Sequence, residues 1–273
     1  MTPPTPTPIL GLRLTPMPLV RGGWTRVIER TFVVYRKAWL VFLTGMLEPL
    51  FYLLSIGVGL AALVPAFTLS DGTPIGYTAF IAPAMLAASA MNGAIFDSTY
   101  GVFFRLKYQK LYDVMLATPL RPRDIAVGEI VWSLGRGTVY SAAFVLIMVA
   151  MDLTSSWWTW LALPAAMLIG FAFAGMAMAL TTFMRSWQDF EFVQLAIMPM
   201  FLFSATFYPL ATYPEGLRLV VQATPLYQGV ALERALTTGT VGVEAVGHVA
   251  YLVVMGVVGL RIAAHRIDTL LLR

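Results

Sequence analysis

The chain has 273 residues, of which 59% are hydrophobic and only 12% charged, and its mean hydropathy is +0.77. Soluble domains usually hold about 25% charged residues, so this composition excludes a water-soluble globular enzyme. It predicts an all-α polytopic membrane protein, because helices satisfy their own backbone groups in lipid. The absence of cysteine excludes disulfides, thiolate metal ligands and a cysteine nucleophile.

The first residues of the chain are rich in proline and contain no continuous apolar run. This composition predicts a disordered tail over residues 1–22 and no signal peptide. The membrane domain is expected to occupy residues 23–273.

Residues 24–37 have the pattern of an amphipathic helix. Trp24, Val27 and Phe32 fall near one helical face, whereas Arg26 and Arg30 fall on others. Such a helix is expected to lie along the membrane interface. The alternative is a basic flank that only sets the topology of the first span.

Six apolar stretches are long enough to cross a bilayer, which needs roughly 20 helical residues. The expected spans are residues 38–64, 77–96, 129–151, 157–184, 192–213 and 243–264.

The first of these spans contains Glu48 followed by Pro49. An ionised acid inside a membrane costs a few kcal/mol, and a proline bends the helix or opens its hydrogen bonds. One interpretation is a gate or a polar contact between subunits. The other is an internal ion pair, for example with Arg136 near the start of the third span.

A charged segment, Arg105–Glu129, connects the second and third spans. Lys107–Ala117 is expected to form a short helix with an apolar face, and the prolines that follow end it. Asp124 is expected to be the N-cap of the next helix. The pattern favours a helix that docks onto a soluble partner at the membrane surface; the alternative is a solvated loop.

The long connection between the last two spans, residues 208–239, is too apolar for a fully exposed loop. Short helices that dip back into the membrane suit it, because irregular backbone at that depth must be covered by protein. A small extracellular cap is the alternative.

Basic residues divide unequally between the two sides. With six spans, all but Arg218 and Arg234 of the 18 Lys+Arg residues fall on the side of the two termini. Positive charge favours the cytoplasm, so both termini are expected there, and the excess of basic residues needs no nucleic acid. A tryptophan cluster, Trp157–Trp160, is expected to anchor the fourth span at the outer interface, or else to stack on a sugar or lipid.

Residue patterns of the common catalytic sites are missing. None of the three lysines precedes Ser or Thr, which excludes a Walker A loop. Two histidines are too few for a typical metal site, and an intramembrane serine protease with His248 as base has no convincing nucleophile near Ser204. We therefore expect no catalytic residue, metal or cofactor in this chain, and a motor in another protein.

Four stretches resemble the ABC type-2 exporter permeases: MLEPLFYLLSIGVGL, LYDVMLATPLRPRDIAVGEI with the following Arg136-Gly137, MFLFSATFYPL and PEGLRLVVQATPLYQGV. Within that family the likeness is nearest to the branch of nodulation lipo-oligosaccharide exporters and daunorubicin-type drug exporters. It covers roughly residues 24–264.

The resemblance implies a six-span half-transporter in the bacterial cytoplasmic membrane. It would pair with an identical or sister permease and with two separate subunits that bind ATP and Mg. It also implies a coupling helix at about Arg105–Leu120, an interfacial helix at Trp24–Lys37 and outer re-entrant helices at Leu217–Leu236. The residues expected to couple to the ATPase are Arg105, Lys107, Leu111, Tyr112, Asp113, Met115, Leu116, Thr118, Pro119, Leu120 and Arg121.

The implied cargo is amphiphilic: a lipid, a lipid-linked oligosaccharide or polysaccharide, or a hydrophobic drug. Two alternatives stay open. One is a gated channel, and the other is an assembly subunit that recruits an ATPase but transports nothing.

Overall fold

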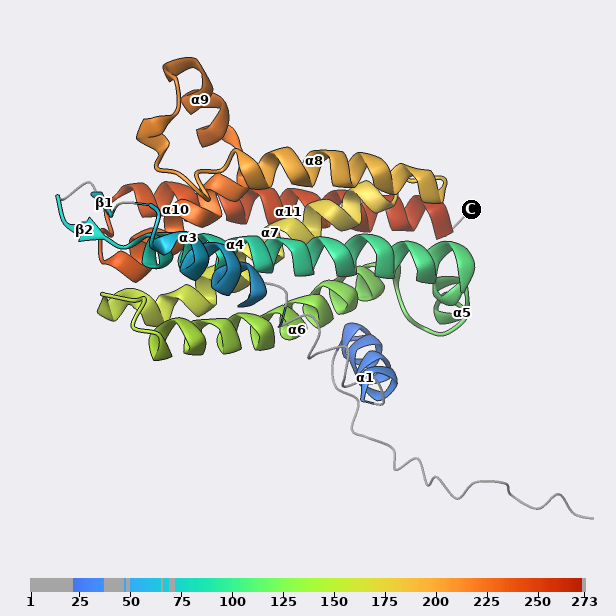
Figure 1. Cartoon of the computed structure of the whole chain (residues 1–273). Coiled ribbons are helices and arrows are strands. Elements are labelled where there is room, and N and C mark those ends of the chain that lie inside the picture. The colour runs from blue at the N-terminus through green and yellow to red at the C-terminus, as the bar shows by residue number, and fades with distance from the viewer. Residues whose placement is uncertain (1–21, 37–46, 48–49, 65, 69–71, 272–273) are drawn as a thin grey trace, which may run out of the picture.

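The computed structural model describes residues 22–36, 47, 50–64, 66–68 and 72–271. Within these ranges the chain is a bundle of long helices that run nearly side by side (Figure 1). The helices are α1 (Trp24–Tyr35), α3 (Gly59–Ala61), α4 (Tyr77–Phe96), α5 (Leu111–Leu116), α6 (Pro122–Ala150), α7 (Ala162–Thr181), α8 (Phe190–Leu202), α9 (Glu215–Ala223), α10 (Pro225–Thr238) and α11 (Glu244–Leu271).

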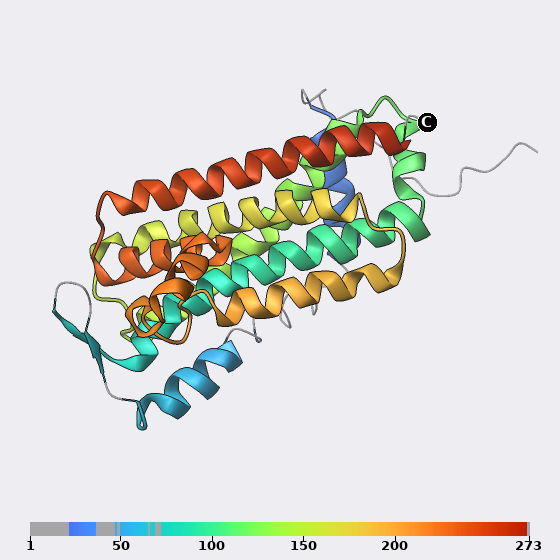
Figure 2. The ribbon, with the colours of Figure 1, turned by 90° about the horizontal axis from the view of Figure 1, so that it is seen from above.

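The bundle has two different ends. Helix α5 and the C-terminus lie at one end, which we call the α5 end, and α9, α10 and a small hairpin lie at the other, the α10 end (Figure 1). The hairpin pairs β1 (Phe67–Thr68) with β2 (Pro74–Ile75) in antiparallel register. Figure 2 shows from above that the apolar helix Leu50–Ala61 lies at the edge of the bundle.

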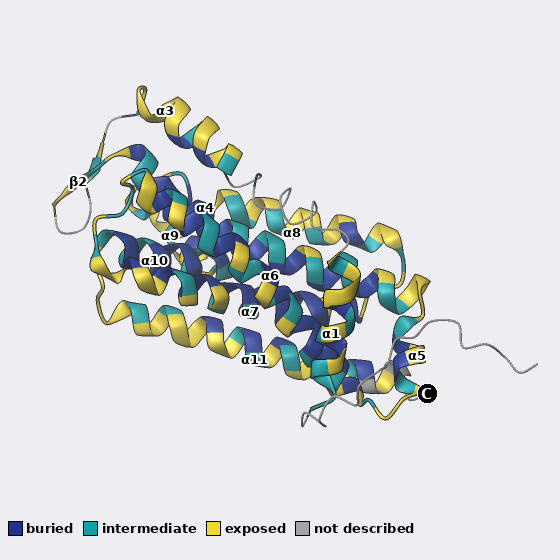
Figure 3. Ribbon diagram, turned by 90° about the horizontal axis from the view of Figure 1, so that it is seen from below, coloured by how far each residue is buried: buried dark blue, intermediate teal, exposed yellow. Residues whose placement is uncertain are grey.

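Helices α4 and α7 form the centre. Neither contains a charged residue, and most of their side chains are buried against α6, α10 and α11. A helix that is apolar on all sides is stable only when it is surrounded by protein or lipid. By contrast, α11 exposes much of its surface, as Figure 3 shows.

Helices α7 and α11 approach each other at glycines. A Cβ atom at Gly175 would lie 2.7 Å from the carbonyl oxygen of Gly256, and one at Gly259 would lie 2.4 Å from the carbonyl carbon of Gly175. Small residues let helix backbones meet in membranes, where packing replaces the hydrophobic effect. This contact therefore fixes the position of α11 on the bundle.

Four helical stretches in the described part of the chain are long and apolar enough to cross a membrane: Tyr77–Tyr108, Pro122–Ala150, Trp157–Thr181 and Glu244–Ile267. The prediction of a helical membrane protein is thus confirmed. The count of six spans stays a prediction, because most of the expected first span lies outside the described residues and α8 has only 13 residues.

The helical stretches on both sides of the charged segment extend beyond the expected span boundaries, although α4 itself has the expected bounds Tyr77–Phe96. The second span does not end at Phe96 but continues to Tyr108, and the third begins at Pro122 instead of Glu129. Both helices carry an acid past the expected boundary, Asp97 and Glu129. Each acid is paired with an arginine, so its charge does not force the helix to end.

The later boundaries also move. The fifth expected span ends at Leu202 and not at residue 213, because the chain turns at Ala205, whose φ of 53° is left-handed. The fourth begins as a 3-10 turn, Trp157–Leu161, and its helix ends at Thr181. The last helix continues beyond residue 264 to Leu271, and the Arg266 guanidinium there lies 4.3 Å from the ring centre of Phe183.

The expected tail and part of the interfacial helix cannot be compared in full. Residues 1–21 and Lys37 lie outside the described residues, and so do Glu48 and Pro49. Helix α1 itself spans Trp24–Tyr35.

Candidate functional site

Helix α5 is a six-residue helix between two long ones. The preceding helix ends in a π-helical turn, Phe104–Tyr108, so Arg105 and Lys107 belong to the end of that helix and not to α5. Lys110 then takes a left-handed conformation with φ of 46°, which reverses the chain direction. The docking helix expected over Lys107–Ala117 is thus shorter, at Leu111–Leu116.

The next helix begins sharply after α5. Pro122 occupies its first turn, where the missing N–H costs nothing. Arg121 is the N-cap residue, and the Asp124 Oδ2 atom accepts a hydrogen bond from the Arg121 backbone N–H at 3.1 Å. Asp124 is therefore in the third helical position and is not the N-cap that the sequence predicts.

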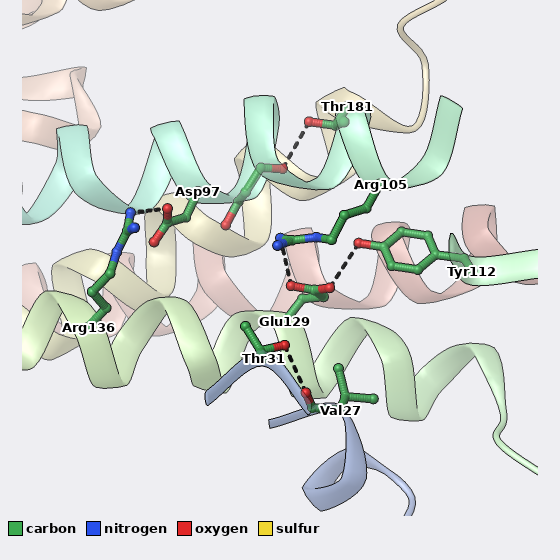
Figure 4. Close-up of polar contacts among 9 residues, drawn as sticks. Val27, Thr31, Asp97, Arg105, Tyr112, Glu129, Arg136 and Thr181 are labelled. Carbon is green, nitrogen blue, oxygen red and sulfur yellow. Dashed lines mark hydrogen bonds and ion pairs between the residues drawn. The ribbon is translucent and has the colours of Figure 1, made fainter. Parts of the chain in front are cut away.

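Three side chains meet beneath α5, and we call Arg105, Tyr112 and Glu129 the Glu129 cluster. The Arg105 guanidinium lies 2.7 Å from Glu129 Oε2, and the Tyr112 hydroxyl donates a hydrogen bond to Glu129 Oε1 at 3.1 Å (Figure 4). Each residue comes from a different element: the end of the second span, α5 and α6. The cluster thus joins α5 to both flanking spans.

Because the Glu129 cluster is largely buried, removing one of its charged residues is expected to destabilise the protein. The Glu129 side chain is 2% exposed and that of Arg105 13%. Burial, followed by the charge of Glu129, raises the pKa of Tyr112 above its ordinary value, so its hydroxyl stays protonated and remains a donor. Removing one partner of a buried ion pair costs about 3–5 kcal/mol, because the remaining charge is left uncompensated.

The opposite face of α5 is open. Tyr112 and Met115 are buried, whereas Asp113 is exposed and Val114 is 66% exposed. The turn after the helix is also exposed at Thr118 and Pro119. A short helix thus has an anchored inner face and a free outer face.

The other residues predicted for this site surround that face. Lys107 and Arg121 are exposed, and Leu111, Leu116 and Leu120 are half-buried. The Thr118 hydroxyl donates to the Met115 carbonyl at 2.5 Å, which closes the last turn of α5. The predicted residues therefore divide between an inner side and an outer surface of the molecule. The inner side includes Arg105, Tyr112 and Met115, and the exposed residues are Lys107, Asp113, Thr118, Pro119 and Arg121.

A second ion pair lies deeper in the bundle. Arg136 pairs with Asp97, which lies in the π-helical turn Asp97–Gly101 (Figure 4). The Thr181 hydroxyl also donates to the Ser98 carbonyl at 3.0 Å and so ties α7 to the same turn. Glu48, the expected partner of Arg136, lies outside the described residues. Among the described residues, Arg136 pairs with Asp97.

Helix α1 packs across the first turns of α6. A Cβ atom at Gly128 would lie 2.6 Å from that of Val27 and 3.0 Å from the Trp24 carbonyl oxygen, so only glycine fits there. Of the basic residues predicted on α1, Arg26 is exposed and pairs with Glu29 at 3.0 Å, and Arg30 is half-buried. The apolar side chains of Phe32, Val33 and Val34 are exposed, and the Phe32 ring centre lies 6.5 Å from that of Trp132 on α6.

Asp97 and Glu129 are the site residues that the sequence reasoning missed. The sequence did contain a signal for these acids. Arg105 and Arg136 lie beside apolar runs, and an arginine in such a position needs an acid nearby. Asp97 and Glu129 flank the same two runs. Which acid pairs with which arginine depends on the register of the two helices, and that is visible only in the fold.

Comparisons with known proteins agree with this architecture. The family described as ABC-2 type transporter matches residues 24–236. Nodulation protein J of Rhizobium leguminosarum bv. trifolii is 33% identical over 245 residues, covering 89% of this chain and 91% of the relative. Nodulation protein J of Rhizobium meliloti is 30% identical, over 90% of this chain and 93% of that protein.

The matched region includes α5, the Glu129 cluster, α9 and α10 up to Leu236. A match over this much of the chain shows the family. The chain belongs to the ABC-2 type transporter family and is a transmembrane subunit of an ABC transporter.

Proposed function

We propose that this chain is the permease of an ATP-driven exporter in the bacterial cytoplasmic membrane. It would move an amphiphilic substrate outward: a lipid, a lipid-linked oligosaccharide or polysaccharide, or a hydrophobic drug. Two separate ATP-binding cassette subunits would bind ATP and Mg, and a second permease, identical or a sister subunit, would complete the pathway.

The observation that carries this proposal is that α5 has one buried face and one exposed face. Its outer face, around Asp113 and Val114, is exposed, whereas Tyr112 on its inner face is held by Glu129. A partner that moves α5 would therefore move the ends of both flanking spans, because Arg105 lies on one and Glu129 on the other. This is the arrangement that a coupling helix needs.

Charge supports placing the α5 end in the cytoplasm. The described basic residues of α1, of the segments flanking α5 and of the end of α11 lie toward this end, whereas Arg218 and Arg234 lie on α9 and α10 (Figure 1). Positive residues favour the cytoplasmic side of a membrane. Helix α1, with exposed apolar residues and a basic face, would then lie along the inner leaflet.

A charge reversal on α5 tests the docking surface. The chain is co-expressed with the stand-alone ATP-binding cassette subunit encoded nearest to it, and the pair is purified and assayed with Mg-ATP. Asp113→Arg should abolish co-purification, or reduce it at least tenfold, because it places a cation on a surface shaped for a partner. Full retention of the partner would contradict the docking assignment.

The matched control is Glu215→Arg on α9, since Glu215 is also an exposed acid but lies at the α10 end. It should leave co-purification unchanged. The same samples in liposomes separate the alternatives: a gated channel would conduct ions without the ATPase, and an assembly subunit would bind the ATPase without moving lipid. The uncharged centre of the bundle, α4 and α7, favours a transporter of amphiphiles over an ion pore.

A further inference from the structure

A second acid is buried at the α10 end. Glu233 lies in α10, its side chain is fully buried, and neither of its carboxyl oxygens has a hydrogen-bond partner among the described residues. Buried polar groups are nearly always satisfied. An acid with two unpaired oxygens in an apolar setting therefore needs an explanation.

Helix packing closes the space around this carboxyl. One turn before Glu233, a Cβ atom at Gly229 would lie 2.9 Å from Ile169 Cδ1 on α7. One turn after it, the Thr237 carbonyl accepts a hydrogen bond from the Ser155 N–H at 3.0 Å. Glu233 lies between these two contacts, where α10 meets α7 without room for a large ligand.

The neighbouring arginine does not neutralise Glu233. Arg234 turns toward α4, where it lies 3.9 Å above the Phe80 ring and donates to the Ala205 carbonyl at 2.9 Å. No ion pair joins Arg234 to Glu233 in the described part of the chain.

Among the described residues, the elements packed against α10 supply no other counter-charge to Glu233. Helix α7 has no titratable side chain, and α4 has only Tyr77. On α11 the nearest groups along the chain are Glu244 and His248, and His248 contacts Gln228 instead of Glu233. The charged residues of α8 and α9 are Glu191, Glu215 and Arg218, of which Arg218 binds the Tyr213 carbonyl.

We propose that Glu233 is a proton-binding site, held as the neutral acid while α10 is packed against α4 and α7. A buried carboxylate without a partner is far less stable than the neutral acid. If α10 moves away from the bundle, water reaches the carboxyl and it ionises, releasing one proton at the α10 end. The packed position of α10 is thus linked to the uptake of one proton from that side.

The buried acid also makes folding dependent on pH. Burial raises the pKa of Glu233 well above its ordinary value of 4.5. The folded protein then holds a proton that the unfolded chain releases, so the stabilisation is complete below 4.5 and is lost as the pH rises through the folded-state pKa.

Infrared spectroscopy of the full-length protein in lipid tests the protonation state directly. At neutral pH, the spectrum of the wild type minus that of Glu233→Gln should contain a protonated carboxylic C=O band that shifts in heavy water. The matched control Glu244→Gln removes an exposed acid at the same end and should remove only carboxylate bands. Loss of a carboxylate band in Glu233→Gln would overturn the proposal, because it would show an ionised group with an unseen partner.

Thermal unfolding provides the second measurement. The melting temperature of the wild type should fall relative to that of Glu233→Gln as the pH rises above 4.5, and Glu244→Gln should follow the wild type. A constant difference between wild type and Glu233→Gln at all pH values would contradict the proton site. If Glu233→Gln does not fold, carbon-13 labelling of glutamate in the wild type still tests the proposal, because the absence of a label-shifted protonated C=O band at neutral pH would contradict it.

Discussion

Glu129 and Glu233 are both buried acids in apolar helices, but they lie at opposite ends of the bundle and have opposite surroundings. Glu129 has an arginine and a tyrosine hydroxyl from two other elements. Glu233 has no partner for either oxygen in the described residues. The same side chain is therefore a fixed charged joint at the α5 end and, as we propose, a neutral acid at the α10 end.

The difference indicates how each end can move. At the α5 end, separating the elements would expose or strand a charge, so α5, the second span and α6 are expected to move together. At the α10 end, α10 is held by apolar packing and by hydrogen bonds to backbone carbonyls. Under the proposal for Glu233, ionisation of this carboxyl would favour the departure of α10 from the bundle.

The largest effect is expected at the charged joint. Arg105→Ala should destabilise the protein by about 3–5 kcal/mol, because it leaves Glu129 buried without its cation. Denaturant unfolding in mild detergent measures the loss. Tyr112→Phe removes one hydrogen bond to a charged group and should cost less, about 1.5–3 kcal/mol.

The double variant Arg105→Met with Glu129→Leu serves as the control. Replacing both charges with apolar residues should recover most of the lost stability, but not the coupling of the ATPase to transport. Equal destabilisation by the single and double variants would show that the pair contributes through packing and not through its charges.

Glycine substitutions provide a smaller test of the rigidity of the two ends. Gly128→Ala should cost about 1–3 kcal/mol, because the new Cβ meets the Val27 Cβ at 2.6 Å and a backbone oxygen at 3.0 Å. Gly229→Ala meets only the flexible Ile169 side chain, so its cost should be smaller. The unfolding free energies of the two variants show which substitution costs more stability.

Gly135→Ala is the matched control, since it lies in α6 and its Cβ would have nothing within 4 Å. It should stabilise the protein by about 0.5–1 kcal/mol through helix propensity. If Gly229→Ala were the more damaging substitution, the α10 end would be the more rigid one and the comparison would be reversed.

The smallest effect is expected at Asp189, a partly exposed acid near the α5 end. Asp189 accepts hydrogen bonds from the backbone N–H groups of Arg185 and Ser186, at 2.6 and 3.1 Å, and these lower the pKa of Asp189. Its stabilising effect is present above the unfolded-state value and is lost as the pH falls through the lower folded-state value. Asp189→Asn should therefore lower the melting temperature slightly at neutral pH and not in strong acid, opposite in direction to Glu233→Gln.

Much of the molecule was predictable from its sequence. Long uncharged runs predict spans because the bilayer requires about 20 apolar helical residues, and the charged segment after the second run predicts a docking helix. The family likeness was visible in LYDVMLATPLRPRDIAVGEI, and the family match confirms it. The amphipathic residues of α1 were also evident from their helical spacing.

The ends of the spans were less predictable. A charged residue suggests the end of a membrane span unless its ion-pair partner is known. Asp97 and Glu129 stay inside helices because Arg136 and Arg105 neutralise them. Similarly, the apolar run 192–213 predicts one span, but α8 ends at Leu202, shortly before the left-handed turn at Ala205.

The sequence by itself determined that this chain is a helical membrane subunit with a charged helix between two spans, because hydropathy and charge act locally along the chain. Only the tertiary structure decided that Glu129 has two partners, whereas Glu233 has none among the residues that the structure describes. That distinction depends on which faces of distant helices meet, and helical register and packing, not composition, set those contacts.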